Sequence, residues 1–405
     1  MAILASRMRS VVPSATTSVS RRAAALAAEG RAIIRLSEGE PDFDTPEHIK
    51  DAARAALSAG LTKYTATDGT VALKMAIAEK FEREDGLSYS PDEIIVSTGG
   101  KQVLFNAFLA TVERGDEVII PAPYWVSFPE MVRLAGGTPV FVECGENVGF
   151  KLTVEKLREA LTSKTKWVVI NNPNNPSGAC YSAEELHMLS EELLAWPDVL
   201  IMSDDIYEHI LFDDCVHHTI VALEPGLRDR TLLCNAVSKT YAMTGWRIGY
   251  GAGPRELVAA MTTVQSHSTS NPNSIAQEAA RAALSSPMDF LQEELATYEK
   301  RRICCWERLN AIDGLNCAKP GGALFIFPSC RGLIGRRTPA GVEIHSDVAL
   351  AAYLLEEAGV AVVPGTAFGL SPYFRISLGE PLAVLEEACS AIAAACARLA
   401  LIPQS

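Results

Sequence analysis

The sequence predicts an α/β protein with a large domain, whose mostly parallel seven-stranded sheet is covered by helices, and a smaller α+β domain. Between about residues 45 and 253, short apolar segments alternate with longer helical patterns, which is the order of elements that builds a parallel sheet. Several of these segments are apolar throughout, as expected for strands that are covered by helices on both faces. After Pro287 the pattern changes to long helices with few strands, which predicts the smaller domain.

Each strand of the large domain is expected in a short apolar segment. These segments are residues 93–97, 117–121, 138–142, 166–171, 199–203, 231–235 and 247–252. In the smaller domain, strands are expected at 323–327, 361–363 and 373–378. A helix is expected after Ser182, because Glu185 completes a capping box with it. We place the large domain at 46–287 and the smaller one at 1–45 together with 288–405.

Composition and charge exclude several classes of protein. The chain has 405 residues and a formal charge of −13, which would repel nucleic acid and anionic membranes. Its longest apolar runs, such as residues 117–123, are too short to span a bilayer. The first residues contain no apolar stretch typical of a secretory signal. Ten scattered cysteines without metal-type spacing are read as thiols in a reducing cytoplasm.

Polar residues follow several of the predicted strands, at the edge of the sheet where α/β proteins bind ligands. They are Gly99-Gly100-Lys101, Tyr124-Trp125, Asn174-Asn175-Pro176, Asp204 with Tyr207, and Ser238-Lys239. Together they offer an amine, an acid, an amide, a phenol, a large aromatic ring and a glycine turn. This set suits a charged heteroaromatic cofactor, and few structural roles need all of these groups at strand ends.

Lys239 is the candidate for covalent attachment of such a cofactor. A Ser-Lys pair alone is typical of a solvated loop, but Arg247 and several glycines follow it, and glycine lets the backbone approach a ligand closely. An amine that forms a Schiff base must be desolvated or close to cations, so that its neutral form is accessible. Arg247 can supply that positive charge and bind a phosphate.

Asp204 and Asn175 each have a structural and a functional interpretation. An aspartate after a strand is commonly a turn or capping residue, yet Asp204 could also pair with a ring nitrogen and keep it protonated. Its neighbour Asp205 points elsewhere in any regular backbone, so only one carboxylate is expected to reach the ring. Asn175 lies in a Pro- and Gly-rich turn that could be purely structural. With Tyr207, it could also donate a hydrogen bond to a phenolate oxygen.

Three further candidates have the same ambiguity. Gly99-Gly100 opens a predicted helix, whose amides and dipole suit a phosphate, although strand-to-helix turns often contain glycine. Trp125 could stack on a flat ring or pack in the core. Arg375 could pair with an acidic side chain or bind a substrate carboxylate as a bidentate fork.

With these residues in place, the chain resembles the class I, fold type I, pyridoxal-phosphate-dependent aminotransferases, and within them the bacterial aspartate aminotransferases that include prephenate-using members. The similarity runs from the PSAT motif at Pro13 to the final helix. The motifs that carry it are SEGEPDFDTP, KYT, STGGKQVLFNAF, PAPYWVSFPEM, NNPNNPSG, SDDIYEH, SKTYAMTGWRIGY and FRISLG.

The resemblance implies a role for each candidate residue. Lys239 would hold pyridoxal 5′-phosphate and transfer the proton, while Asp204 would pair with the ring nitrogen. The ring oxygen would bond Tyr207 and Asn175, and Trp125 would stack on the ring. The residues around the phosphate would be Gly99, Gly100, Lys101, Ser238 and Arg247, joined by Tyr64 of a neighbouring subunit, which implies a homodimer. The substrate carboxylates would be held by Arg375, Asn175, Trp125, the Gly39 backbone and Lys101.

The sequence departs from the family pattern at three positions. Val12 stands where close relatives carry a lysine linked to prephenate use, so the resemblance does not extend that activity to this chain. Asp205 replaces the usual glutamate, outside the expected ring contact. Ala236 stands where many members have a phosphate-binding serine, so one phosphate contact is expected to be missing.

The expected activity is ping-pong transamination between an amino acid and 2-oxoglutarate, with L-aspartate as the first choice of donor. Aromatic or other amino acids, or a lyase reaction on the same scaffold, are the alternatives. A regulator that only binds the cofactor would normally carry a DNA-binding module, and no basic patch or extra segment is found. A nicotinamide-binding enzyme would need a dinucleotide fingerprint after the first strand, which the glycines do not form.

Overall fold

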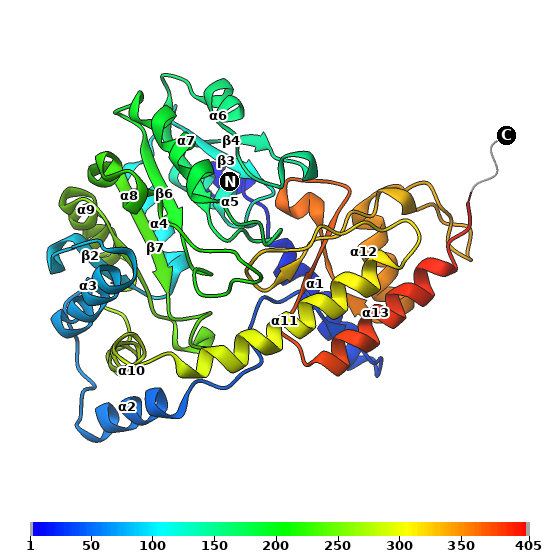
Figure 1. The fold of residues 1–405 in the computed structure, drawn as a ribbon, viewed down its shortest axis with the longest axis horizontal. Coiled ribbons are helices and arrows are strands. Elements are labelled where there is room, and N and C mark those ends of the chain that lie inside the picture. Colours follow the sequence, from blue (N-terminus) through cyan, green and yellow to red (C-terminus); the bar gives the residue numbers. More distant parts are fainter. Residues whose placement is uncertain (1–2, 402–405) are drawn as a thin grey trace.

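The computed structural model describes residues 3–401 and contains a seven-stranded sheet, which lies in the left-hand part of the molecule in Figure 1. The strand order is β2-β8-β7-β6-β5-β3-β4, and only β8 runs antiparallel to its neighbours. The mostly parallel sheet predicted from the sequence is therefore confirmed. The strands are β2 (Ile94–Ser97), β3 (Glu117–Ala122), β4 (Thr138–Glu143), β5 (Thr165–Asn171), β6 (Leu200–Asp204), β7 (Thr231–Ala236) and β8 (Gly249–Ala252).

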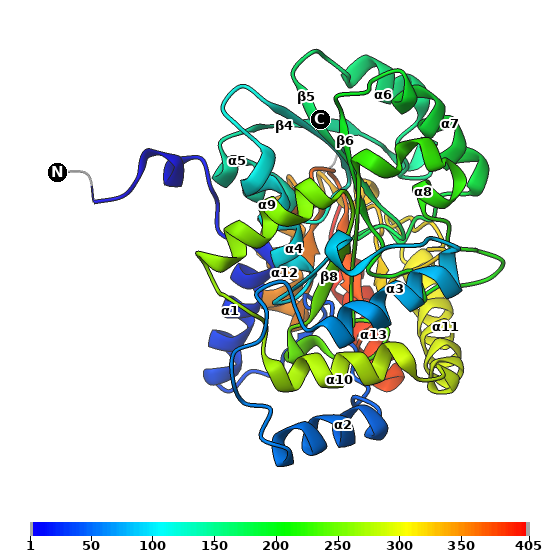
Figure 2. The ribbon, with the colours of Figure 1, turned by 90° about the vertical axis from the view of Figure 1, so that its left-hand side faces the viewer.

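Helices cover both faces of this sheet, because successive strand residues are apolar on both sides. Ile119 packs in one buried cluster, and its neighbours Val118 and Ile120 pack in the other, as the two-residue period of a strand requires. Figure 2 shows α4 and α9 on one side of the strands and α3, α7 and α8 on the other. The first side is covered by α4 (Gly100–Thr111), α5 (Phe128–Ala135) and α9 (Arg255–Ser266), and the second by α3 (Val71–Asp85), α6 (Val154–Ala160), α7 (Ala183–Leu194), α8 (Ile220–Leu223) and α10 (Ser274–Ser285).

The capping box predicted at Ser182 is present. The Ser182 hydroxyl accepts a hydrogen bond from the Glu185 amide at 3.2 Å, and the Glu185 carboxylate accepts one from the Ser182 amide at 2.8 Å. Helix α7 begins directly after Ser182. Among the helices described for residues 3–401, none is long and apolar enough to cross a membrane.

A further buried cluster lies beyond the large sheet, around α11 (Asp289–Asn310), α12 (Asp347–Ala358) and α13 (Leu382–Ala397). In Figure 1, α11 runs from below the large sheet to α13. An antiparallel sheet of β11 (Val363–Pro364), β12 (Phe374–Ser377) and β9 (Phe325–Ile326) packs there. The domain boundaries at residues 45 and 287 remain a prediction.

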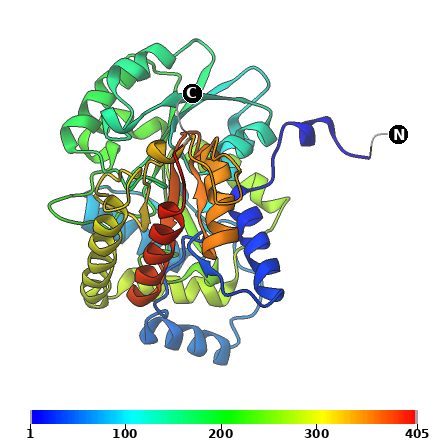
Figure 3. The same cartoon turned by 90° about the vertical axis from the view of Figure 1, so that its right-hand side faces the viewer.

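The strand predicted at 361–363 is wrong in one respect, because the chain forms two short strands there. Strand β10 (Val360–Ala361) pairs with β1 (Ile34–Arg35), and β11 pairs with β12. The two halves therefore hydrogen-bond to different partners, which the local apolar pattern does not reveal. Through β1, the segment after α1 (Ala15–Ala28) joins this smaller part, and Figure 3 shows α1 beside α12, with the chain before it extending away.

Candidate active site

Lys239 lies in the turn that follows β7, and its amine is enclosed by protein. Its Nζ donates a hydrogen bond to the carbonyl oxygen of Gly39, from the N-terminal segment. Burial lowers the pKa of the Lys239 amine to about 8, against an opposing effect of Glu40. The positive charges of Arg375, Arg247 and Lys101 lower this pKa further. A substantial fraction of this amine is therefore neutral near pH 8, as a nucleophilic lysine requires.

The amine opens into a cavity of about 230 Å³. Nine of the thirteen residues predicted for the site line it, and they come from segments far apart in the sequence. These are Gly39, Gly100, Lys101, Trp125, Asn175, Asp204, Tyr207, Lys239 and Arg375. A concave site with a few converging polar groups is the usual form of a small-molecule site.

Asp204 is the last residue of β6 and is buried at the cavity wall. The Asn171 amide donates to its carbonyl oxygen at 2.9 Å and so fixes the backbone there. Burial and the nearby charge of Asp205 raise the pKa of Asp204 to about 7, and no cation is among the groups that shift it. A buried carboxylate without a cationic partner is costly, so this side chain is suited to a positively charged ligand group.

Asp205 faces away from the cavity, as expected from the sequence. Its carboxylate accepts a hydrogen bond from the Ser203 hydroxyl at 2.8 Å and lies 3.6 Å from the His217 imidazole. Only Asp204 of this pair lines the cavity.

Arg375 extends from β12 into the cavity and is almost completely buried. Its Nη1 donates to Asn175 Oδ1 at 2.9 Å, and its Nη2 donates to the Ser37 carbonyl oxygen at 2.6 Å. The guanidinium carbon lies 4.3 Å from the ring centre of Phe325 and 4.9 Å from that of Phe368. Burial lowers the pKa of Arg375 to about 10. The Nε atom is buried and has no hydrogen-bond partner among the described residues, so this fixed fork retains a capacity to bind a carboxylate.

A second positive region surrounds the first turn of α4. Gly99 has a φ of 83°, and a Cβ at this position would overlap the guanidinium of Arg247. A Cβ on Gly249 would overlap the backbone of Gly100. The helix start is thus packed closely against β8 and Arg247, and free amides at a helix start favour an anion.

Four predicted residues do not line the cavity. Ser238, Gly99 and Arg247 lie beside lining residues in sequence or in space. Ala236 is also near this region, 3.7 Å from where a Cβ of Gly100 would be, and supplies no hydroxyl. Tyr64 is 91% exposed, and within one chain the structure does not bring it to the cavity.

Several lining residues were not predicted. Ser14, Thr16 and Thr17 come from the start of α1, and Phe325 comes from the smaller part of the chain. The PSAT motif contains the first two of these, but nothing in its local pattern indicates that it packs against a sheet edge.

Lys101, one of the predicted residues, is exposed and also lines the cavity. Its ammonium lies 4.8 Å from the ring centre of Trp125.

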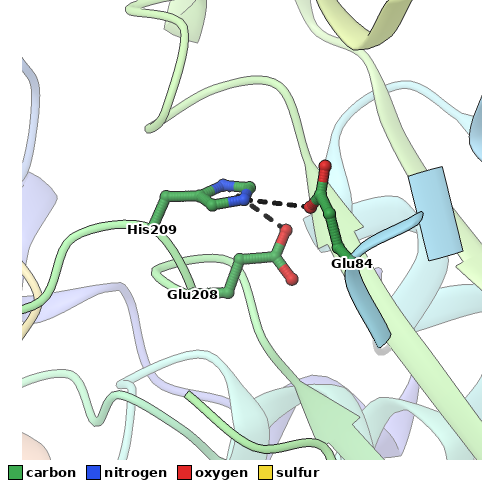
Figure 4. A group of neighbouring side chains, drawn as sticks. All are labelled: Glu84, Glu208 and His209. Atoms are coloured by element: carbon green, nitrogen blue, oxygen red, sulfur yellow. Dashed lines mark hydrogen bonds and ion pairs between the residues drawn. The ribbon is translucent and has the colours of Figure 1, made fainter. Parts of the chain in front are cut away.

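An ionic network of Glu84, Glu208 and His209 includes the segment that follows Tyr207 (Figure 4). His209 is hydrogen-bonded to Glu84 at 3.0 Å and to the Thr240 hydroxyl at 3.2 Å. Glu208 forms an ion pair of 2.7 Å with the fully buried ammonium of Lys80. The spacing of Glu84, Glu208 and His209 would also suit a metal ion, but the Lys80 ammonium already neutralises these carboxylates. The network links the segment after Tyr207 to the residue after Lys239.

The fold and the cavity define an α/β enzyme whose cavity is lined by a lysine of lowered pKa and by a buried arginine. The sequence matches the family Aminotransferase class I and II over residues 31–392. The chain belongs to this family.

Proteins of known activity resemble it along nearly its whole length. An aspartate/prephenate aminotransferase of Cereibacter sphaeroides is 56% identical, over 98% of this chain and 100% of that protein. The crystal structure of the aspartate aminotransferase from Rhizobium meliloti has a TM-score of 0.96 and 54% identity, over 99% of this chain and 100% of that one. The aspartate aminotransferase from Thermus thermophilus with maleate has a TM-score of 0.91 and 42% identity, over 98% and 100% of the two chains.

The residues at the site fit pyridoxal phosphate, on which this family generally depends. Lys239 offers a buried amine of lowered pKa, and Asp204 offers a buried carboxylate without a cation. The start of α4 and Arg247 offer amides and a guanidinium for a phosphate. The chain thus offers an amine for a Schiff base, a carboxylate for the ring nitrogen, and amides with a guanidinium for the phosphate.

Proposed function

We propose that this aminotransferase moves the amino group of L-aspartate to 2-oxoglutarate, with pyridoxal 5′-phosphate held on Lys239. The observation that carries the proposal is the buried fork of Arg375, which opens into the same cavity as the Lys239 amine. An α-carboxylate on this fork would place the substrate amine and Cα near the lysine. The amino-acid donor and the oxo-acid acceptor each carry an α-carboxylate. One cavity would therefore bind both in turn, as a ping-pong reaction requires.

The preference for a dicarboxylic substrate rests on Lys101. Lys101 lines the cavity, and no carboxylate is among the groups that shift its pKa, which partial desolvation and then the charge of Arg247 lower. Arg375 would hold the α-carboxylate with Asn175 and the Gly39 backbone, and Lys101 beside Trp125 would take the distal one. The names of the relatives and the maleate in the Thermus structure support this substrate class. Prephenate is left out of the proposed substrates because Val12 stands where close relatives carry a lysine linked to its use.

The same residues would hold the cofactor. Asp204 would pair with the ring nitrogen, Tyr207 and Asn175 would bond the ring oxygen, and Trp125 would stack on the ring. The phosphate would lie among Gly99, Gly100, Lys101, Ser238 and Arg247. When bound, the cofactor supplies an electron sink that stabilises negative charge at the substrate Cα.

The chain's own part in the reaction is proton transfer and positioning. The Lys239 amine, with its pKa lowered to about 8 by burial, would take the proton from Cα and return it at the cofactor carbon. Asp204 would hold the proton on the ring nitrogen, because a buried carboxylate gains stability from a cationic partner. Arg375 would keep the Cα–H bond directed at the amine.

We further propose a homodimer in the cytoplasm, in which Tyr64 of each subunit reaches the phosphate of its partner. The exposure of Tyr64 supports this, because a 91% exposed tyrosine in a single chain is available for a contact between subunits.

The first experiment compares wild type, Lys239→Ala and Lys164→Ala, an exposed lysine as control. We expect wild type and control to bind pyridoxal phosphate with a visible absorption band and to convert aspartate and 2-oxoglutarate to oxaloacetate and glutamate. Lys239→Ala should lose the band and at least roughly 100-fold of the rate. Turnover of Lys239→Ala at the wild-type rate would refute the role of the lysine. Release of ammonia when no oxo-acid acceptor has been added would instead indicate a lyase.

A further inference from the structure

Two cysteines on different active-site loops meet at the surface of the large domain. Cys180 follows the turn that carries Asn175, and Cys215 lies in the loop that begins after Asp204. Both sulfur atoms pack against the same backbone. A Cβ built on Gly321 would lie 2.7 Å from Cys215 Sγ and 3.4 Å from Cys180 Sγ. The two thiols are also close enough for a hydrogen bond between them to affect the pKa of Cys180.

This pair is accessible from solvent. Cys180 and Cys215 are both partly exposed and line a surface cavity of about 310 Å³, together with Ser182, Asp214 and His218. Cys305 and Cys389 are a second pair of neighbouring thiols, but they are 0% and 2% exposed. The chain therefore contains an accessible thiol pair and, as an internal comparison, an inaccessible one.

We propose that Cys180 and Cys215 form a reversible disulfide, which makes this pair a redox modification site of the enzyme. The backbone already holds the two loops together here. Gly321 and Gly322 donate to the Gly178 carbonyl oxygen at 3.0 and 2.9 Å, and Phe212 donates to that of Gly321 at 2.9 Å. Closing the bond thus requires movement of the side chains with little displacement of the loops.

The oxidant would be a low-molecular-weight disulfide such as glutathione disulfide. Burial and then the neighbouring Cys215 raise the pKa of Cys180, which disfavours Cys180 as the first nucleophile, and we assign the first attack to Cys215. Its thiolate attacks one glutathione sulfur and releases one glutathione thiolate. Cys180 then loses its proton to water and attacks Cys215 Sγ, which releases the second glutathione. Two protein thiols and one glutathione disulfide become one protein disulfide and two glutathione thiols.

The disulfide would connect the loop that carries Asn175 to the loop that carries Tyr207. Both residues line the active-site cavity. The bond would close a covalent loop between residues 180 and 215, which restricts the unfolded chain. We expect the temperature of unfolding to rise by roughly 5 °C on oxidation.

The test incubates the folded holoenzyme in glutathione buffers of increasing oxidised fraction, blocks remaining thiols, and maps the cysteines by peptide mass spectrometry. We expect a Cys180–Cys215 linked peptide that disappears on reduction, while Cys305 and Cys389 remain thiols. Detection of Cys180 and Cys215 only as free thiols or glutathione adducts would overturn the proposal.

Single variants separate the two steps. In Cys180→Ala, Cys215 should stop as a mixed disulfide with glutathione, and in Cys215→Ala, Cys180 should stay unmodified. Neither variant should show the temperature shift, and both should match reduced wild type in unfolding temperature under reducing conditions. An equal shift in wild type and both variants would show that it arises elsewhere, and would also contradict the proposal.

Discussion

Arg375 and Asn175 lie 200 residues apart in the sequence and meet in a buried hydrogen bond of 2.9 Å between Nη1 and Oδ1. One comes from β12 in the smaller part of the chain, and the other from the loop after β5. The bond aligns the guanidinium plane, and the Ser37 carbonyl fixes its second nitrogen at 2.6 Å. The proposed carboxylate site therefore depends on how the two parts of the chain pack.

Substitution Arg375→Lys keeps the charge but removes the planar fork. A lost hydrogen bond to a charged group costs about 1.5–3 kcal/mol, so KM for aspartate should rise roughly 10- to 100-fold. Steady-state kinetics with aspartate and 2-oxoglutarate measure this. Arg308→Lys, at an exposed position on α11, is the control and should leave KM unchanged. An unchanged KM in Arg375→Lys would exclude this arginine as the carboxylate ligand.

Asp204 should make the stability of the cofactor-free protein depend on pH. Its pKa rises from 3.8 to about 7 on burial, so folding is unaffected by this group below pH 3.8 and is disfavoured as the pH rises to 7. Above pH 7, the ionised carboxylate lowers the free energy of unfolding by about 4 kcal/mol. Urea unfolding at several pH values should show this loss in wild type and not in Asp204→Asn. Asp198→Asn, at an exposed position, should keep the wild-type slope, and parallel curves for all three proteins would contradict the prediction.

Lys101 should influence the reactivity of Lys239. Its positive charge is one of those that lower the pKa of the Lys239 amine, so Lys101→Met should raise that pKa. The rate at which the protein captures pyridoxal phosphate, followed by absorbance, should rise with pH around a midpoint near 8 in wild type. The midpoint should lie at higher pH in Lys101→Met and be unchanged in Lys164→Met. A midpoint that stays in place would show that the charge of Lys101 does not influence the Lys239 amine.

Lys80 should be essential for stability, because it neutralises buried carboxylates. Its ammonium is fully buried against Glu208 at 2.7 Å, with Glu84 at 3.3 Å and Asp85 at 3.5 Å. Removing one partner of a buried pair typically costs about 3–5 kcal/mol, so Lys80→Met should lower the urea midpoint strongly. Lys300→Met, at an exposed position, should change the free energy of unfolding by less than about 0.5 kcal/mol. Equal midpoints for the two variants would contradict the role of the network.

Tyr64 tests the proposed dimer. If its hydroxyl bonds the phosphate of a partner subunit, Tyr64→Phe should weaken binding of pyridoxal phosphate roughly 10-fold or more, since a hydrogen bond to a charged group is lost. Titration of the cofactor measures this, and sedimentation velocity should show a dimer for both proteins. A fully active monomer would refute the shared site.

The order of the elements, and most of the polar groups that line the cavity, could be predicted from the sequence. Apolar segments such as the one that forms β5 predicted strands covered on both faces, and Asp204 and Lys239 were found because they follow strands. This works since the carboxyl ends of parallel strands meet at one edge of a sheet, so local position in the sequence already implies proximity.

Features that depend on contacts between distant segments could be seen only in the folded chain. Tertiary structure placed Asp205 beside His217, and it brought Ser14 and Phe325 into the lining. It also split residues 360–364 between two sheets, and buried Lys80 among carboxylates. Hydrophobic periodicity reports which face of an element is buried, but not which distant segment covers it, and that choice is made by packing of the whole chain.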